Sequence, residues 1–572
     1  MAAGARGTRR SGELGAFVVI GVIANAEDHG VVRAFFELFK TPWEFLREDG
    51  IYDVVLCAGD FQPSKTAKLI IVYAGRKTKH DVQAQTAIPD RRLASRRLVY
   101  GVDNFPIYGS VISFAGGQGC LLKDNDSGQC VGYFQETGNT AYVRIGYDLF
   151  HEIRTLLTVG QPSANAIVPT LDLHIAVLRD LIISRGISLV EIPPVPEGYN
   201  FIACLTHDVD HPSIRQHKLD HTMLGFIYRA TLGSLRNLIA GQITIRQFLR
   251  NWVAALKLPL VHLGFAKDFW REFAERYQNI EQEFRSTFFV LPFKNRPGVS
   301  ANGPAPAYRA SGYAARDIAD VLARLIASGN EVGLHGIDAW ADISKGREEL
   351  REIATSAGAA PSGVRMHWLY YNQDTPAKLE KAGAAYDSTF GYNDAIGYRA
   401  GTTQVYKPLA AHQLLELPLH VMDTALFYPS RMELSPREAE PILEKIQNNA
   451  ARFGGVVTVN WHDRSLAPER LWDEPYRSLL ASMKRRGAWF ATAGEAVAWF
   501  RKRRSAAFET DPAIPGASRV ALPAGESASL PGLRLRTHRP APKLPAQGHP
   551  SAAFSDEQVA SSFPACSLSG AN

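Results

Sequence analysis

From residue 201 onward the chain alternates short apolar runs with stretches that have helical periodicity. Runs such as 286–290 and 456–459 have the length of buried strands, and segments such as 315–328 and 436–453 have the period of helices. Repeated strand–helix units join strands by crossovers, which makes the strands parallel. Further strands are predicted at residues 201–205, 331–334, 363–365 and 414–417. The pattern predicts an α/β fold whose chemistry lies at the carboxyl ends of parallel strands.

The composition is that of an ordinary globular protein, and it excludes some partners. The chain has 572 residues, of which 46% are hydrophobic and 21% charged, which allows two or three domains. A net charge of +6 is small for this length and predicts no nucleic-acid binding. The odd number of cysteines, without paired metal spacing, argues against a disulfide framework and favours a reducing compartment. They are Cys57, Cys120, Cys130, Cys204 and Cys566.

Changes in composition predict three regions. Residues 1–195 hold several strand and helix patterns and are predicted to form a smaller N-terminal α/β domain of unknown role. The proline-rich run 192–198 leads into a second domain, 196–503, with a helical insertion at about 212–284. Residues 504–572 are rich in Pro, Ala, Ser and Gly with little periodicity, so we expect a disordered tail.

Two carboxylates follow the apolar run 201–205 in close succession. Asp208 and Asp210 are one residue apart, and alternate residues of a strand face the same side. Two like charges in one pocket are unfavourable unless a cation or a proton lies between them. The pair therefore predicts a metal ion together with a carboxylate base.

Other residues able to bind metal also follow predicted strands. His335 follows 331–334, His367 follows 363–365, and His462 with Asp463 follows the strand that ends at 459. Oxygen and imidazole donors at one edge of a sheet suit zinc or a similar divalent ion with an open position for water. Each residue also has an ordinary structural interpretation. A lone histidine is usually a surface or core residue, Asp338 has the position of a helix cap, and Arg365 that of an ion-pair partner.

In their order along the chain, these segments resemble the polysaccharide deacetylase superfamily, also called carbohydrate esterase family 4 or the NodB homology domain. The matching segments are Thr206-His207-Asp208-Val209-Asp210, Ser286-Thr287-Phe288-Phe289, Glu331-Val332-Gly333-Leu334-His335, Arg365 and Val459-Asn460-Trp461-His462-Asp463. The resemblance covers roughly residues 200 to 500. It implies a distorted (β/α) barrel that binds one divalent metal ion, which we expect to be zinc.

The resemblance also implies roles for individual residues. Asp208 would be the catalytic base and Asp210 a metal ligand, with His335 as the first metal histidine. Arg365 would orient the base, and His462 would be the catalytic acid.

The chain departs from the family at one ligand position. The family commonly has a second ligand histidine four residues after the first, where this chain has Ala339. We expect His367 to take its place as a metal ligand, with Asp338 or a water molecule as the alternatives.

The expected function is metal-dependent hydrolysis of a non-peptide carbon–nitrogen bond. The leading hypothesis is removal of N-acetyl groups from an amino-sugar polysaccharide or glycan precursor, so the expected partner is a carbohydrate substrate. A cyclic amide or ureide hydrolase of the same fold is an alternative. A non-catalytic glycan-binding barrel is another, and Ala339 favours it.

A basic helical region suggests peripheral membrane contact. Within residues 222–257, Arg229, Arg236, Arg246, Arg250 and Lys257 accompany apolar residues, as in helices that lie on anionic membranes. A helical insertion whose apolar face packs on its own domain is the simpler interpretation. No clear export signal or membrane-spanning run is visible, so a cytoplasmic location, with or without membrane association, is expected.

Overall fold

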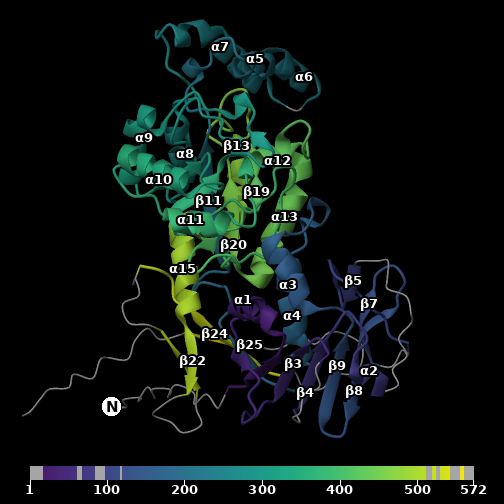
Figure 1. The fold of residues 1–572 in the computed structure, drawn as a ribbon. Coiled ribbons are helices and arrows are strands. Elements are labelled where there is room, and N and C mark those ends of the chain that lie inside the picture. Colours follow the sequence, from purple (N-terminus) through teal and green to yellow (C-terminus); the bar gives the residue numbers. More distant parts are fainter. Residues whose placement is uncertain are drawn as a thin grey trace, which may run out of the picture. The chain divides into compact units, whose positions relative to one another are not determined.

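The computed structural model divides into two compact units (Figure 1). It describes residues 17–60, 67–83, 97–115, 119–241, 243–510, 518–522, 529–540 and 554–558. The first unit comprises Met1–His151, His174–Pro193 and Arg501–Asn572, and the second comprises Glu152–Leu173 and Pro194–Phe500. None of the described helices is long and apolar enough to cross a membrane.

The units are interleaved in sequence, whereas a single boundary at residue 195 was predicted. Residues 152–173 belong to the second unit because Asp172 accepts hydrogen bonds from the Thr402 hydroxyl (2.6 Å) and the Thr403 amide (2.9 Å). These contacts join positions about 230 residues apart in sequence, so local pattern alone does not reveal them.

The first unit is built on a nine-stranded mixed sheet of order β2-β1-β3-β4-β9-β8-β7-β5-β6. Strands β2, β1, β3, β4 and β9 are parallel neighbours, and the rest pair antiparallel. Its strands are β1 (Ile20–Ile23), β2 (Trp43–Phe45), β3 (Val54–Ala58), β4 (Leu69–Tyr73), β5 (Arg97–Tyr100), β6 (Asp103–Pro106), β7 (Cys120–Asp124), β8 (Cys130–Thr137) and β9 (Thr140–Ile145). Helices α1 (His29–Phe39) and α2 (Lys79–Gln83) belong to this unit, and α3 (Leu149–Thr158) runs from it into the second unit. Helices α4 (Thr170–Ile183) and α15 (Ala493–Ser505) begin in the second unit and end in the first.

Within residues 504–572, for which the sequence predicts a disordered tail, some of the residues that the structure describes form strands. Strand β24 (Arg534–His538) pairs antiparallel with both β10 (Leu189–Glu191) and β25 (Phe554–Gln558). Strands β22 (Ala507–Thr510) and β23 (Ser518–Ala521) form a second antiparallel pair. The His538 imidazole reaches the buried Glu191 carboxylate at 3.0 Å. Pairing with a distant strand supplies the order that this low-periodicity segment lacks by itself.

The second unit has an all-parallel sheet of order β18-β17-β16-β15-β12-β11-β20-β19, with β21 also paired to β11. Its strands are β11 (Phe201–Val209), β12 (Thr287–Val290), β15 (Glu331–Gly336), β16 (Gly363–Met366), β17 (Tyr386–Asp387), β18 (Leu415–Glu416), β19 (Val421–Met422), β20 (Val456–Asn460) and β21 (Ala488–Ala491). The predicted parallel strand–helix architecture is confirmed. Strand β11 is longer than predicted and includes Asp208.

The connection between the two end strands requires this sheet to curl. Glu416 of β18 and Val421 of β19 are five residues apart, which spans at most about 18 Å. Eight strands side by side in a flat sheet would separate these ends by about 34 Å. The segment that links β18 to β19 also forms hydrogen bonds to strands from both ends of the sheet. Leu417 N–H donates to the Asp387 carbonyl of β17 (2.8 Å), and His420 N–H donates to the Thr458 carbonyl of β20 (3.2 Å). The result is a curled, half-barrel parallel sheet.

Helices fill the connections between these strands. Between β11 and β12 lie α5 (His221–Tyr228), a π-helical segment Arg229–Gly233, α6 (Ser234–Ile239), α7 (Ile245–His262) and α8 (Phe273–Glu281). The later crossovers contain α9 (Ala319–Ala327), α10 (Ile343–Ala357), α11 (Thr375–Ala382), α12 (Asp423–Phe427), α13 (Pro436–Phe453) and α14 (Asp473–Arg485). Helix α13 has the predicted bounds, and a capping box from Ser435 and Glu438 together with a first-turn proline explains its start.

Candidate metal centre

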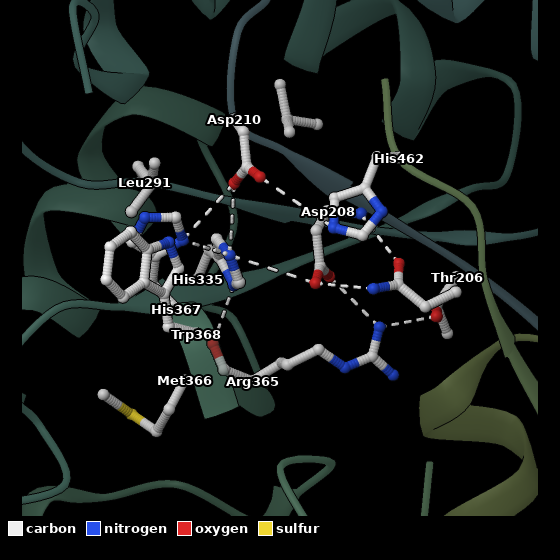
Figure 2. A network of polar contacts seen from close by, with 12 residues as sticks. Thr206, Asp208, Asp210, Leu291, His335, Arg365, Met366, His367, Trp368 and His462 are labelled. Atoms are coloured by element: carbon white, nitrogen blue, oxygen red, sulfur yellow. Dashed lines mark hydrogen bonds and ion pairs between the residues drawn. The ribbon is translucent and has the colours of Figure 1, made fainter. Parts of the chain in front are cut away.

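The predicted site residues converge at the carboxyl ends of the strands of the second unit (Figure 2). Asp208 lies at the end of β11, and Asp210 follows it. His335 lies near the end of β15, and Arg365 lies in β16, directly before Met366 and His367. His462 follows β20 by two residues. Parallel pairing of adjacent strands brings these side chains from separate segments of the sequence to one edge.

Asp210, His335 and His367 form a compact set of metal-capable donors. Their ligand atoms all lie within 4.8 Å of one another. Asp210 Oδ1 is 3.4 Å from both His335 Nε2 and His367 Nδ1, and these two nitrogens are 3.0 Å apart. The three donors therefore surround one point (Figure 2).

In His335 and His367, the partner of the ring nitrogen that points away from Asp210 decides which nitrogen carries the proton. His335 Nδ1 lies 2.9 Å from the carbonyl oxygen of Arg365, and His367 Nε2 lies 3.1 Å from that of Arg309. A carbonyl only accepts hydrogen bonds, so both of these nitrogens carry the proton in the neutral ring. The two facing nitrogens, His335 Nε2 and His367 Nδ1, are then both lone-pair acceptors.

Three acceptors pointing at one another favour a cation or a proton between them. Asp210 Oδ1 is buried and has no hydrogen-bond donor, and leaving such an oxygen unpaired is costly. Burial lowers the pKa of His367 to about 3, which keeps the ring neutral and able to bind metal. Two imidazoles oriented by backbone carbonyls, with one carboxylate, are a donor set that suits zinc with an open position. The residues fit a divalent ion.

Asp208 is held beside this triad as an ionised carboxylate. Arg365 donates to its Oδ1 at 3.1 Å, and Asn460 Nδ2 donates to its Oδ2 at 2.7 Å. Burial by itself raises the pKa of Asp208, but His335, Arg365 and His462 outweigh it and hold that pKa below its ordinary value. Oδ2 lies 3.9 Å from His335 Nε2. A charged base therefore borders the triad.

His462 has the opposite protonation state. Its Nδ1–H donates to Asp423 Oδ1 at 2.6 Å, which leaves Nε2 directed at the site, 3.9 Å from Asp210 Oδ2. Burial lowers the pKa of His462, but Asp423, and then Asp210 and Asp208, raise it to about 9. His462 is thus an imidazolium at neutral pH, able to donate a proton.

The structure places two of the candidates for the third ligand, His367 and Asp338, in different surroundings. His367 belongs to the donor set, whereas Asp338 accepts from the Val299 amide (2.7 Å) and the Lys345 ammonium (3.0 Å). Ala339 is fully buried, and a Cβ added to Gly346 would lie 3.3 Å from its methyl group. Ala339 therefore packs closely against α10 and does not belong to the donor set. His367, directly after the next strand β16, lies in the donor set instead.

The mouth of the site is a cavity of about 190 Å³ with aromatic and basic walls. Tyr308 and Trp368 lie with ring centres 5.5 Å apart at this mouth, and Tyr308 is 66% exposed. Trp368 has a φ of 62°, in the left-handed region that a bulky residue rarely adopts. This strained turn directly after His367 orients the indole toward the opening. Exposed aromatic faces of this kind are suited to packing on a sugar ring.

Comparison with known proteins finds similarity only among solved structures. No family model matches the sequence, and no curated protein matches it. A proposed polysaccharide deacetylase from Mycobacterium smegmatis is 19% identical, with a TM-score of 0.33, over 54% of this chain and 95% of that one. An allantoinase is 14% identical (TM-score 0.32; 53% and 91% covered), and a polysaccharide deacetylase from Bacillus cereus is 13% identical (TM-score 0.25; 51% and 91% covered).

Three residues of the site were not found from the sequence. Asp423 holds His462, Asn460 holds Asp208, and Arg309 donates to the carbonyl of His367 at 2.8 Å. Asn460 lies within the quoted segment that ends in His462 and Asp463, so its position gave a usable signal. Asp423 follows a strand of only two residues, β19, and such a short run cannot be recognised from periodicity.

Proposed function

We propose that this protein is a zinc-dependent hydrolase that removes N-acetyl groups from an amino-sugar polysaccharide or glycan precursor, on a distorted (β/α) barrel of the deacetylase type. One observation carries the proposal: an ionised carboxylate and a protonated imidazole border the same triad of metal-capable donors. Base and acid beside one electrophilic site is the arrangement that amide hydrolysis requires. The aromatic mouth supports a sugar as the substrate.

Asp210, His335 and His367 would hold the ion. When bound, it would supply Lewis-acid polarisation of a carbonyl oxygen and a lower pKa for an attacking water. The donor set leaves room for substrate, because three protein ligands are one fewer than a closed tetrahedral site uses.

Asp208 and His462 would move the protons. Asp208 takes a proton from the attacking water, and Arg365 and Asn460 keep the carboxylate charged and oriented for this step. His462 Nε2–H then donates to the amine nitrogen as its bond to the carbonyl carbon breaks. The water oxygen bonds to the carbonyl carbon as the carbon–nitrogen bond breaks, so the products are acetic acid and a free amino sugar. Asp208 then loses its extra proton to solvent and His462 regains one, which restores the enzyme. Asp423 keeps His462 protonated before each turnover.

The direct test measures acetate released from N-acetylhexosamine glycans by purified protein supplied with zinc or cobalt. We expect release by the native protein and a loss of roughly 10²- to 10⁴-fold in Asp208→Asn. A panel of cyclic amides and ureides run beside the glycans separates the two hydrolase classes. Turnover of the cyclic compounds alone would replace the deacetylase proposal by the ureide alternative, and no turnover of either class by metal-loaded protein would refute both.

A further inference from the structure

Exposed apolar side chains of the described residues gather on one segment of the second unit. We call helices α5 to α7, with the Arg229–Gly233 segment, the helical hairpin. Its first arm consists of α5, the Arg229–Gly233 segment and α6, and its second arm is α7. The two arms pack against each other at the top of Figure 1. Large apolar side chains exposed by 41% to 81% occur in it at Leu224, Tyr228, Leu232, Leu235, Ile239, Ile245, Leu249, Val253, Leu256 and Leu260, and just after it at Leu263 and Phe265. Elsewhere on the described surface such residues are scattered singly, which is ordinary.

On α7 these residues form one stripe. Ile245, Leu249, Val253, Leu256 and Leu260 follow spacings of four, four, three and four residues, which at 3.6 residues per turn places them within about 80° of the helix surface. The helix already buries its opposite face, through Asn251, Ala254, Leu258 and Val261. The exposed stripe is therefore a second apolar face, without a partner in the part of the chain that the structure describes.

The first arm repeats the pattern. Leu224, Tyr228, Leu232, Leu235 and Ile239 have the same spacings of four, four, three and four residues and are all exposed. Two packed helical arms carrying the same outward stripe form a continuous amphipathic element, whereas single exposed leucines would have no such order. The expected packing of the apolar face on its own domain accounts for only one face of each arm.

The charge of the hairpin identifies the kind of surface it fits. Residues 221–267 contain six Lys and Arg residues and no Asp or Glu. On α7, Arg246, Arg250 and Lys257 fall together along one border of the apolar stripe, at about 100° to 140° from Ile245. Helices that lie in a membrane interface combine an apolar face with a basic border. A second copy of this chain would meet the same positive charge, which disfavours pairing between hairpins.

The same hairpin lines the mouth of the metal centre. Thr222 and Arg229 border the cavity together with Asp210 and His367. On α5 and the residue that follows it, Thr222 and Arg229 lie about 100° to 160° round the helix from Leu224 and Tyr228. The start of the first arm thus presents apolar side chains outward and its other side to the cavity.

Positive charge also surrounds this mouth. Arg229, Arg464 and Arg470 act on one another, and burial with the field of Arg470 and Arg464 lowers the pKa of Arg229 to about 10. Arg470 and Arg464 in turn lower the pKa of Tyr428 to about 8. Glu469 acts on Arg229, and Asp463 and Glu469 act on Arg464. None of the three arginines forms an ion pair with a carboxylate among the described residues. A substrate with an anionic group would neutralise this charge.

We propose that the helical hairpin docks on an anionic lipid bilayer and that the substrate is an N-acetylated amino sugar carried by a membrane lipid through a phosphate. The apolar stripes lie at the acyl boundary, and Arg246, Arg250 and Lys257 contact lipid phosphates. The docking follows from the hairpin alone, whereas the substrate rests on the proposed function.

Docking is tested by flotation of the full chain with two kinds of vesicle, phosphatidylcholine alone and phosphatidylcholine mixed with phosphatidylglycerol. We expect the protein to float with the mixed vesicles and to be released by high salt, because screening weakens the basic contacts. Leu249→Glu with Leu256→Glu should lower the bound fraction at least roughly tenfold, since two buried apolar contacts are lost. The matched control is Ile51→Glu with Val102→Glu, at residues 97% and 91% exposed outside the hairpin, and it should float normally.

A second set of variants tests the charge without touching the apolar stripe. Arg246→Gln, Arg250→Gln and Lys257→Gln together should reduce flotation with mixed vesicles. As the matched control, substitution of glutamine for the exposed Arg437, Lys445 and Arg485 removes the same net charge and should leave flotation unchanged. Absence of native flotation with mixed vesicles, or equal flotation of all variants, would overturn the docking. A native dimer that Leu249→Glu with Leu256→Glu dissociates, without vesicle binding, would show instead that the stripe joins two copies.

Activity measurements separate this inference from the proposed chemistry. Asp208→Asn should float like the native protein while releasing no acetate. Leu249→Glu with Leu256→Glu should lose acetate release from a vesicle-borne N-acetylglucosaminyl phospholipid and keep release from a water-soluble N-acetylated oligosaccharide. Equal loss on both substrates would refute the lipid-linked substrate. Flotation without any deacetylation would refute the proposed function and leave the docking intact.

Discussion

His335 Nε2 lies 3.0 Å from His367 Nδ1, and each ring donates its other nitrogen's proton to a backbone carbonyl. Two lone pairs at this distance repel each other unless a cation or a proton lies between them. A metal ion bound there would relieve this repulsion, and Asp210 adds a third acceptor to the pair. The first prediction follows from this pair.

Replacing His367 with alanine should abolish tight metal binding, because it removes one of three protein donors. We expect the metal content after dialysis to fall from about one ion per chain to well below that value. Elemental analysis of dialysed protein measures it. Asp338→Asn is the matched control, since that carboxylate bonds to Lys345 and the Val299 amide and should leave the metal content unchanged. Full occupancy in His367→Ala would exclude it as a ligand.

Replacing Asp423 with asparagine should move the alkaline limit of activity to lower pH. Asp423 is the main group that raises the pKa of His462 to about 9 against the effect of burial. His462 must be protonated to donate, so activity falls as pH rises through this pKa. Without the Asp423 charge the pKa falls, and the loss begins at lower pH. The pH profile of kcat tests this, with Asp342→Asn, at an exposed helix cap, as the control. An unchanged alkaline limb would contradict the assigned role.

Replacing Arg365 should change the acidic side of the pH profile of activity. Its guanidinium is fully buried and donates to Asp208 Oδ1, the Thr206 hydroxyl and Ser388. In Arg365→Met the pKa of Asp208 should rise, because one of the charges that lower it is lost. As pH is lowered, activity is then lost at a higher pH than in the native protein. In addition, kcat should fall by roughly 10²-fold or more, because Asp208 is no longer held in position.

Arg365→Lys distinguishes charge from geometry. Lysine restores a positive charge but cannot supply the planar fork that holds three partners at once. We expect the acidic limb to return toward the native position while kcat stays low. Recovery of both quantities would mean that Arg365 acts by charge alone, and a native acidic limb in Arg365→Met would show that it does not affect Asp208.

A buried carboxyl pair should make stability depend on pH. Asp387 and Glu416 are direct neighbours in β17 and β18. Burial raises the pKa of Asp387 to about 6, and burial together with Asp387 raises the pKa of Glu416 well above its ordinary value. The folded state therefore keeps protons that the unfolded chain has released. This stability is fully present below pH about 4 and is lost as pH rises through the folded-state pKa values, by about 1.4 kcal/mol for each pH unit over which one such proton is retained.

Urea denaturation between pH about 5 and 8 measures this dependence. Glu416→Gln mimics the protonated side chain and should flatten the fall in the free energy of unfolding, while Glu440→Gln, at an exposed position on α13, should leave it unchanged. If the stability of the native protein does not decrease over this pH range, the folded state does not retain protons on Asp387 and Glu416.

Most of the candidate site could be predicted because its residues follow recognisable strands. Asp208, His335 and Arg365 lie at or near the ends of apolar runs long enough to show strand periodicity. Asp423 could not be found in this way, since β19 has two residues and is ordered by pairing with β20. The roles assigned to these residues stay predictions, and the variants above test them.

The C-terminal segment 504–572 also shows what local sequence cannot predict. Residues 504–572 lack periodicity, and the sequence alone indicates disorder. Strand β24 is nevertheless ordered by backbone hydrogen bonds to β10, about 350 residues earlier. Edge pairing of this kind depends on main-chain groups that every sequence has, so composition carries little information about it.

Local sequence by itself determined the alternation of strands and helices, and with it the edge at which Asp208, Asp210, His335, Arg365 and His462 meet. Periodicity and parallel connection rules act over short stretches and can be recognised directly. Only the tertiary structure shows that His367 lies in the donor set while Asp338 bonds elsewhere, because this difference depends on where Lys345 and the Arg309 carbonyl lie. It also decided the curl of the sheet and the outward stripe of the hairpin. These features arise from contacts between distant segments, and the energy of such contacts is not encoded in any one of them.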